Sequence, residues 1–419
     1  MHDSKVRSRL KAQLTKFSTE FSEGLSKPLT KFVSQMLFGI QASQDVKLSN
    51  IARSLKEEIP LIKTEDRLSR NLKAEELESQ LMQQLVKMGS QRVATNMVLA
   101  LDLSDIRKEY AKKMEHLAQV RDGSTGELHQ GYWLCDVTGA EVHSSEIVPL
   151  YQKLYSVEAE DFTSENAEIL TAIDLVRAHT QGRGIWAIDR GGDRKKLLEP
   201  LLERGERFVI RSTGKRSVID RRKLKGSVAE VAGKCRLRHQ ARIIKIKDGV
   251  ETTLELRYGS EPIRLPGRDE TLLLVVVSGF GKQPLMLLTD ISQARDSSTL
   301  WWIVEIYLTR WKIEETFRFI KQSYNLEDIR VMKYQRLKNL VVLVTAAAYF
   351  AATFLGQKMK LRILCEKLLV ISQRFFGIPP FRFYALADAI KTILAQTSLS
   401  PPPEPVSSRQ LQLTLAWEV

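Results

Sequence analysis

The sequence of 419 residues contains few cysteines and no long hydrophobic segment. Its three cysteines, Cys135, Cys235 and Cys365, are too scattered for a disulfide framework. The longest apolar run, residues 340–355, has 16 residues, whereas a helix needs about 20 to span a bilayer. No apolar run follows Met1, as a signal peptide would require. We therefore expect a reducing cytoplasm, no membrane partner and a buried core helix at 340–355.

Histidine is also scarce, since the chain has only six, and they are dispersed. Cys235 and His239 have no second pair of ligands beside them, so their spacing does not predict a zinc site. Gly279-x-Gly281 lacks the rest of a nucleotide-binding fingerprint. Metal-binding thiols and a nucleotide loop are thus not indicated.

Positive charge is what the sequence has in excess. Its 64 Lys and Arg against 50 Asp and Glu give a net charge of +14, which favours nucleic acid first and anionic membrane second. Between Arg211 and Lys247, 13 basic residues accompany only 2 acids. Because so one-sided a segment repels itself, we expect phosphate contacts there. The alternative is a solvated loop. The residues expected to contact DNA are Arg221, Arg222, Lys223 and Lys225.

The hydrophobic patterns predict an α/β protein with a mixed sheet. Apolar runs at 97–101, 132–135, 142–148, 184–188 and 208–210 read as strands, with helices over 164–179 and 194–204 between them. The segments expected along the chain are a helical DNA-binding domain (1–96), the first part of a catalytic core (97–211), a β-rich basic insertion (212–295), a helical second part of the core (296–390) and a Pro-rich tail (391–419).

The N-terminal segment contains a candidate helix-turn-helix. Residues 48–55 show apolar spacing typical of one helix face, Pro60 is expected to end that helix, and Thr64 is expected to cap the next. The second helix would carry Arg67 and Arg70 toward DNA. A plain helical bundle with a solvated basic face is the alternative.

Two aspartates each come directly after an apolar strand: Asp102 after residues 98–101 and Asp189 after residues 184–188. An acid in that position is costly to desolvate unless a metal or another cation balances its charge. The alternative is a helix cap or turn residue, which is a strong alternative for Asp189 because Arg190-Gly191-Gly192 follows it.

A third acid belongs to a polar stripe on a predicted helix. Residues 300–321 contain no Gly or Pro, and Tyr307, Arg310, Glu314 and Lys321 fall within a stripe about 60° wide at 100° per residue. Glu315 points away from this stripe. The alternative is a surface helix with an Arg310–Glu314 ion pair. Just upstream, Trp301 and Trp302 are core residues or a stacking platform for a displaced base.

The string YLTRWKIEETFRFIK, residues 307–321, resembles the Tyr-Arg-Glu-Lys signature of a large family of bacterial insertion-sequence transposases. The resemblance extends to Asp102 and to Asp189-Arg190-x2-Asp193. It implies a ribonuclease-H-like catalytic domain with an Asp-Asp-Glu triad, here Asp102, Asp189 and Glu314, and a β-rich insertion before the glutamate.

The resemblance implies a Mg²⁺-dependent transposase acting in the bacterial cytoplasm at the nucleoid. Three carboxylates suit two Mg²⁺ or Mn²⁺ ions, which activate a water or a 3′-hydroxyl and stabilise the leaving oxygen. The enzyme would cut the terminal inverted repeats of its element and join the 3′ ends to target DNA, as a homodimer on DNA. The alternatives are a related nuclease without strand transfer and a domesticated, non-catalytic DNA-binding protein.

Overall fold

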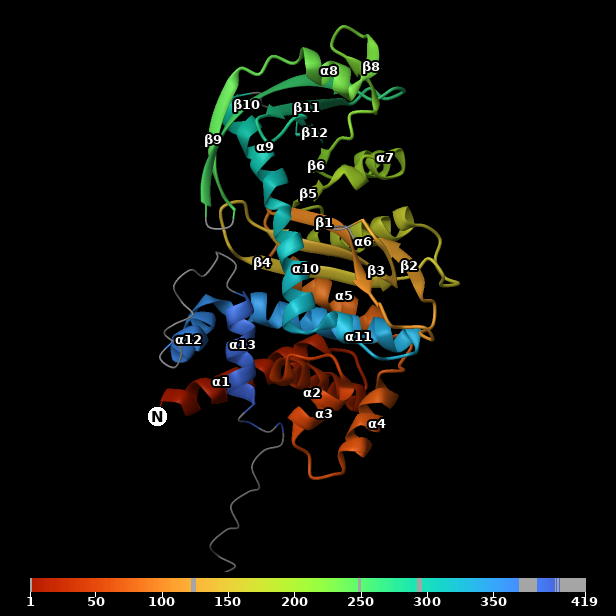
Figure 1. Ribbon diagram of the computed structural model, residues 1–419, viewed down its shortest axis with the longest axis vertical. Coiled ribbons are helices and arrows are strands. Elements are labelled where there is room, and N and C mark those ends of the chain that lie inside the picture. Colours follow the sequence, from red (N-terminus) through yellow and green to blue (C-terminus); the bar gives the residue numbers. More distant parts are fainter. Residues whose placement is uncertain are drawn as a thin grey trace, which may run out of the picture.

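A computed structural model describes residues 2–121, 126–247, 250–291, 296–368, 383–395, 397 and 399. Figure 1 shows helices at one end of the long axis, a mixed sheet with flanking helices in the middle and the strands of the insertion at the other end. The proline-rich segment at 400–405 lies outside the described residues. The mixed α/β fold with a helical N-terminal region is thus as predicted.

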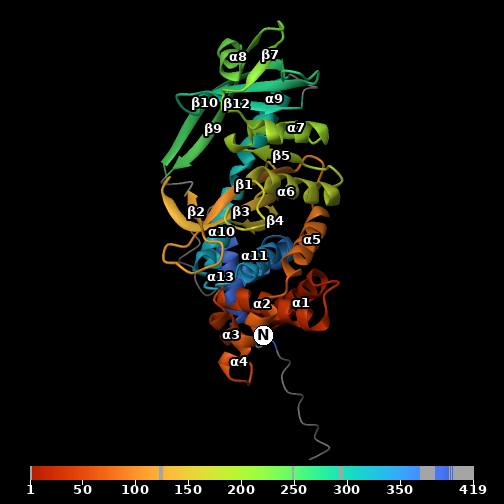
Figure 2. The same cartoon turned by 90° about the vertical axis from the view of Figure 1, so that its right-hand side faces the viewer.

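The N-terminal helices pack against helices from the other end of the chain (Figures 1 and 2). They are α1 (His2–Phe21), α2 (Lys27–Ser43), α3 (Leu48–Leu55), α4 (Leu61–Asn71) and α5 (Leu77–Ser90). Their partners are α11 (Tyr334–Tyr349), its wider last turn η3 (Phe350–Phe354), α12 (Gly356–Leu368) and α13 (Phe383–Leu394). Gln41 donates to the Ala347 carbonyl at 2.7 Å, and Asn339 donates to the Leu72 carbonyl at 3.0 Å. One hydrophobic cluster therefore joins both ends of the chain.

The long apolar helix Tyr334–Phe354 is a core helix. It is long and apolar enough to cross a membrane, but 83% of its apolar window is buried inside the protein. Leu340, Leu343 and Phe350 are fully buried against the sheet and the N-terminal helices. Burial within the protein thus accounts for its composition, as expected from the sequence.

The central sheet has the strand order expected for a ribonuclease-H-like fold. β1 (Val98–Arg107), β5 (Ile185–Ile188) and β6 (Phe208–Arg211) are parallel neighbours. On the other side of β1, β3 (Leu128–Ala140) and then β4 (Ile147–Tyr155) follow in antiparallel pairing. The short β2 (Ala118–Arg121) pairs with the first residues of β3. The order β4-β3-β1-β5-β6 places the first and fourth strands of the core, β1 and β5, side by side.

Two predicted strand positions were wrong. β1 continues six residues past Leu101, because its polar residues keep pairing with β3. The strand predicted at 142–148 instead runs over Ile147–Tyr155 and includes Pro149. Proline is tolerated there because β4 pairs on one side only and its register with β3 shifts at Val137/Thr138.

The insertion extends the same sheet rather than forming a second one. Its β12 (Leu285–Thr289) pairs antiparallel with β6, and β11 (Thr271–Ser278) and β10 (Val250–Arg264) follow. The outer strands are β9 (His239–Lys247), β7 (Ser217–Asp220) and β8 (Lys225–Ser227), with helix α8 (Val228–Lys234) after β8. A second hydrophobic cluster lies where β10–β12 meet helix α9 (Ser297–Thr309).

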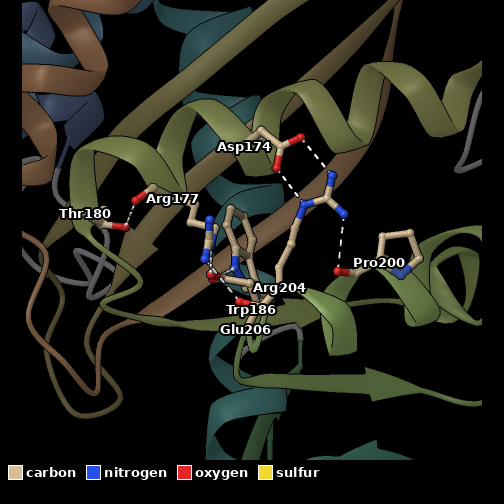
Figure 3. Close-up of polar contacts among 7 residues, drawn as sticks. All are labelled: Asp174, Arg177, Thr180, Trp186, Pro200, Arg204 and Glu206. Atoms are coloured by element: carbon tan, nitrogen blue, oxygen red, sulfur yellow. Dashed lines mark hydrogen bonds and ion pairs between the residues drawn. The ribbon is translucent and has the colours of Figure 1, made fainter. Parts of the chain in front are cut away.

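Polar contacts fix strand β5 against the helices beside it (Figure 3). The indole of buried Trp186 donates to Glu206 at 2.8 Å, and Arg177 of α6 (Glu165–Thr180) donates to the same carboxylate at 2.7 Å. Arg204, which follows α7 (Lys195–Glu203), binds Asp174 with two hydrogen bonds of 2.6 and 2.9 Å. Because β5 ends at Ile188, this cluster fixes the position from which the next residue projects.

The candidate helix-turn-helix forms as two helices, α3 and α4, with a corrected boundary. Helix α4 begins at Leu61 directly after Pro60, so Thr64 is not its cap. Thr64 is buried, and its hydroxyl donates to Glu57 at 2.9 Å, while Arg67 binds the same carboxylate at 2.6 Å. Arg70 remains exposed. Glu57, in the turn before α4, thus binds both Thr64, which was expected to cap the helix, and Arg67, which was expected to contact DNA.

Candidate active site

The pairing of β1 with β5 brings two aspartates together. The last parallel pair is Leu101 with Ile188, and Asp102 and Asp189 follow at the next position of each strand. Asp102 lies within β1, whereas Asp189 leaves the sheet. The Asp189 carboxylate contributes to raising the pKa of Asp102. The register therefore brings together the two aspartates of the triad that the resemblance implies.

A tight turn fixes the side chain of Asp189. Its carboxylate accepts a hydrogen bond of 2.6 Å from the Gly191 backbone and caps the short helical turn η1 (Arg190–Gly192). A side chain at Gly192 would place its Cβ 2.5 Å from Ile188, so the close approach requires glycine. Asp189 thus caps the turn η1, as the alternative interpretation expected, and it does so with one of its two carboxylate oxygens.

Asp193 binds residues at the start of the insertion rather than Asp102 or Asp189. Its side chain is 1% exposed, pairs with Arg216 and accepts from Ser212 at 2.8 Å and the Thr213 backbone at 2.8 Å. These contacts lower the pKa of Asp193 against the opposing effect of burial. They tie the end of η1 to the start of the insertion.

The helix predicted over residues 300–321 is divided at Arg310. Helix α9 ends at Thr309, and α10 (Trp311–Ser323) begins beyond Arg310. Hydrogen bonds from Arg310 N to the Tyr307 carbonyl (3.1 Å) and from Ile313 N to the Arg310 carbonyl (3.0 Å) tighten this point. The division falls where the buried face changes: α9 packs in the second cluster and α10 in the first.

Arg310 connects two of the three candidate acids. One guanidinium nitrogen lies 3.0 Å from Asp102 Oδ2 and the other 2.7 Å from Glu314 Oε1. The side chain is only 12% exposed, and it lies 5.8 Å from the ring centre of Tyr307. The predicted Arg310–Glu314 ion pair therefore exists, but it includes Asp102 as well. We call Asp102, Asp189, Glu314 and Arg310 the carboxylate centre.

The electrostatics of the carboxylate centre show a shortage of positive charge. Burial raises the pKa of Asp102 to about 6, Arg310 opposes this rise, and Asp189 adds to it. Asp136 lies directly opposite Asp102 in the β1–β3 pair, and burial raises its pKa well above the usual range. Asp136 accepts from Gln152 at 2.7 Å, and its other oxygen has no protein partner. Burial thus disfavours a further negative charge at Asp136, on the strand next to Asp102.

Of the remaining stripe residues, Tyr307 contacts the centre through Arg310, whereas Lys321 pairs with other acids. Lys321 Nζ is 3.5 Å from Glu327 and 3.9 Å from Asp105, near the end of α10. Tyr307 is 8% exposed. Glu315 pairs with Arg318 at 2.5 Å.

The three carboxylates suit a hard divalent cation once Arg310 moves aside. Within the described residues, no group of three or more His, Cys, Asp or Glu is gathered closely enough to hold a metal ion. The guanidinium instead occupies oxygens of Asp102 and Glu314. Carboxylate oxygens are the donors that Mg²⁺ and Mn²⁺ prefer, and the raised pKa of Asp102 indicates a site that a cation would stabilise.

The other predicted DNA contacts lie in or near the insertion. Arg222, Lys223 and Lys225 are exposed at the β7–β8 turn, at the far end of the molecule from β1 (Figure 1). Arg221 lies 3.8 Å from Glu261 and lines a cavity of about 390 Å³ with Arg236, Arg238 and His239. Sequence reasoning missed this second group of basic residues, although Arg236-x-Arg238 lies within the basic segment.

The two tryptophans pack at the edge of the second hydrophobic cluster. Both are half-buried, and the Trp301 ring centre lies 5.5 Å from that of Tyr258. These contacts agree with the core interpretation. They do not bring either ring to the carboxylate centre.

A ribonuclease-H-like sheet with carboxylates at adjacent strand positions is the arrangement of a nucleic-acid phosphoryl transferase. Residues 152–351 match the family model described as the transposase DDE domain, a range that includes Asp189 and Glu314 and begins after Asp102. Residues 152–351 are therefore similar to a transposase DDE domain, which agrees with the resemblance carried by the Tyr-Arg-Glu-Lys string. No curated protein matches the sequence. A solved structure of the piggyBac transposase synaptic complex with hairpin DNA is similar at a TM-score of 0.46 and 10% identity, over 97% of this chain and 82% of that one.

Proposed function

We propose that this protein cleaves the ends of a bacterial insertion sequence and joins the 3′ ends to target DNA. Asp102, Asp189 and Glu314 would hold two Mg²⁺ or Mn²⁺ ions. The observation that carries this proposal is the adjacent register of Asp102 and Asp189, with Glu314 linked to Asp102 through Arg310. Bound ions would activate the attacking oxygen and stabilise the leaving one.

The residues of the chain then act by holding and aligning the DNA strand. Cations held by Asp102 and Glu314 would compete with the Arg310 guanidinium for these oxygens, and the guanidinium could then donate two hydrogen bonds to a phosphate of the scissile strand. Lys321 would hold a phosphate further along α10, and Tyr307 would orient Arg310 through the ring contact. The raised pKa of buried Asp136 and its hydrogen bond from Gln152 favour a structural role in the strand pair rather than a role in holding cations.

Other surfaces would bind the rest of the DNA. The basic turn at 221–225 and the cavity with Arg236 and Arg238 would contact phosphates, while α3 and α4, with exposed Arg70, would contact the terminal inverted repeat. In this proposal residues 1–96 form the DNA-binding domain, and residues 97–211 with 296–390 form the catalytic core. Because two ends are cut in concert, a homodimer would assemble on DNA at the nucleoid.

The experiment that tests this function supplies Mg²⁺ and DNA carrying the inverted repeats that flank the gene. Cleavage followed by joining of the 3′ ends supports the transposase. Cleavage of both matched and scrambled ends without joining favours the related nuclease, and specific binding without cleavage favours a non-catalytic DNA-binding protein. Ends that were cut beforehand separate a joining defect from a cleavage defect.

A further inference from the structure

A second hollow lies beyond the carboxylate centre, between the loop that follows β1 and the loop that follows α10. Its volume is about 690 Å³, and residues 107–114, 327–330 and Met332 line it. Lys108, only 5% exposed, closes its base by donating to the backbone carbonyls of Glu327 and Ile329. These two bonds fasten the loops to each other, so the walls of the hollow are fixed by the fold.

The hollow is connected to the candidate active site by two elements. β1 carries both Asp102 and Arg107, whose positions are about 17 Å apart at roughly 3.3 Å per residue. Glu327, on the opposite wall, is 3.5 Å from Lys321 of the polar stripe. A strand held at the carboxylate centre can therefore reach the hollow within a few nucleotides.

The side chains around the hollow are suited to a flat, anionic ligand. Tyr110 is 88% exposed, although it is an aromatic residue. Lys112 and Lys113 are exposed, and no carboxylate in the described part of the chain lies within ion-pair distance of either. Arg107 pairs with Glu109 at 3.4 Å through one terminal nitrogen, while its Nε is buried without a hydrogen-bond partner. The other carboxylates that line the hollow, Glu327 and Asp328, pair with Lys321 and Lys47. An aromatic face beside two exposed lysines, Lys112 and Lys113, is a combination that binds single-stranded nucleic acid.

We propose that this hollow binds one unpaired nucleotide of the DNA substrate. The base stacks on Tyr110, and the phosphates on either side contact Arg107, Lys112 and Lys113. A base inside a duplex has both faces covered by its neighbours, so only an unpaired base can offer a face to Tyr110. The size of the hollow also suits a single nucleotide rather than a double helix. The inference rests on the proposed DNA transposase function.

Binding of two probes tests this site directly. One probe is a short single-stranded oligonucleotide with a central 2-aminopurine, whose fluorescence falls on stacking, and the other is a blunt duplex of equal length. We expect Tyr110→Ala to weaken binding of the single strand about tenfold and to abolish the quenching. Tyr110→Phe keeps the ring and should behave as the wild type. Neither change should alter duplex binding, and the exposed position makes misfolding no explanation.

Three outcomes overturn the proposal: wild-type single-strand affinity in Tyr110→Ala, unchanged quenching, or an equal loss of duplex binding. Cleavage and joining by the wild-type protein are measured in parallel. Single-strand binding that depends on Tyr110, without any cleavage by the wild type, would leave the hollow standing and reject the transposase. Cleavage and joining by the wild type, together with unchanged single-strand binding and quenching in Tyr110→Ala, would support the transposase and reject the nucleotide site.

Discussion

The carboxylate centre and the β7–β8 turn of the insertion differ in whether their charged side chains have partners. Around Asp102, the Arg310 guanidinium and the Leu103 backbone N–H bind the carboxylate oxygens, and burial raises the pKa of Asp136 on the opposite strand. At the turn, Arg222, Lys223 and Lys225 are exposed, and in the described residues no acid pairs with them. The first region requires exact geometry for chemistry, whereas the second requires only charge density near phosphates.

The difference is also one of local support. β1 and β5 lie inside the sheet, and the Trp186–Glu206–Arg177 contacts fix β5 on its flank (Figure 3). β7 and β8 are short and lie at the edge of the same sheet. Substitutions should therefore act through position at the centre and through charge at the turn, and the predictions below separate these two effects.

The largest effect is expected from the acids themselves. Asp102→Asn, Asp189→Asn or Glu314→Gln should each slow strand cleavage by at least about 1000-fold, roughly 4 kcal/mol of activation free energy, because each removes a carboxylate that we propose as a metal ligand. Affinity for end DNA should change little. Single-turnover cleavage and gel-shift assays measure the two properties. Glu315→Gln, on the neighbouring helix position, is the control and should remain active.

A substitution of Arg310 should separate metal binding from catalysis. In Arg310→Ala the guanidinium no longer competes for Asp102 and Glu314, so Mn²⁺ should bind the DNA-free protein more tightly, while cleavage falls about 100-fold through misplacement of the phosphate. Calorimetric titration with Mn²⁺ and a cleavage assay give the two readings. Lys321→Ala is the control for affinity. Unchanged or weaker Mn²⁺ binding by Arg310→Ala would contradict competition at the site.

The pH dependence of stability should report on Asp102. Because burial raises its pKa from 3.8 to about 6, the folded state holds a proton that the unfolded state releases, and stability falls as the pH rises from about 4 to 6. Asp102→Asn removes this loss, so its free energy of unfolding at pH 7.5 without metal should exceed that of the wild type by up to about 3 kcal/mol. Urea denaturation at pH 4.5 and 7.5 measures it. An equal difference between the two proteins at both values would exclude this titration.

Local patterns were sufficient to predict the elements that surround the carboxylate centre. Apolar runs ending at Leu101 and Ile188 indicated two buried strands, whereas their position as neighbours followed only from the ribonuclease-H-like fold that the resemblance implies. Local patterns could not predict the ends of strands that are set by pairing with distant segments. Asp102, Ser104 and Asp105 interrupt the apolar run, yet β1 continues because β3 pairs with it to Arg107.

The details that decide the chemistry were not present in the sequence pattern. A helical wheel placed Arg310 and Glu314 on one stripe, but it could not show that Arg310 also binds Asp102, 208 residues away. The division between α9 and α10 depends on two separate hydrophobic clusters. The short β7 and β8 contain polar residues, so only the completed sheet edge identifies them as strands.

The smallest effect is expected at the β7–β8 turn, where only the salt dependence should change. Replacing Arg221, Arg222, Lys223 and Lys225 together with alanine should reduce the slope of log affinity against log salt by about 0.9 for each phosphate that the variant no longer neutralises. Cleavage of saturated complexes should stay near normal, because these residues lie far from Asp102 along the sheet (Figure 1). Lys195→Ala with Lys196→Ala, two exposed lysines of α7 outside the insertion, is the matched control. The binding isotherms are measured at several salt concentrations. If the fourfold variant keeps the wild-type slope, the turn faces solvent in the complex. Charge density alone would then not identify a DNA-binding surface in this protein. If it loses cleavage at saturation, the turn acts through position after all, and the contrast with the carboxylate centre fails.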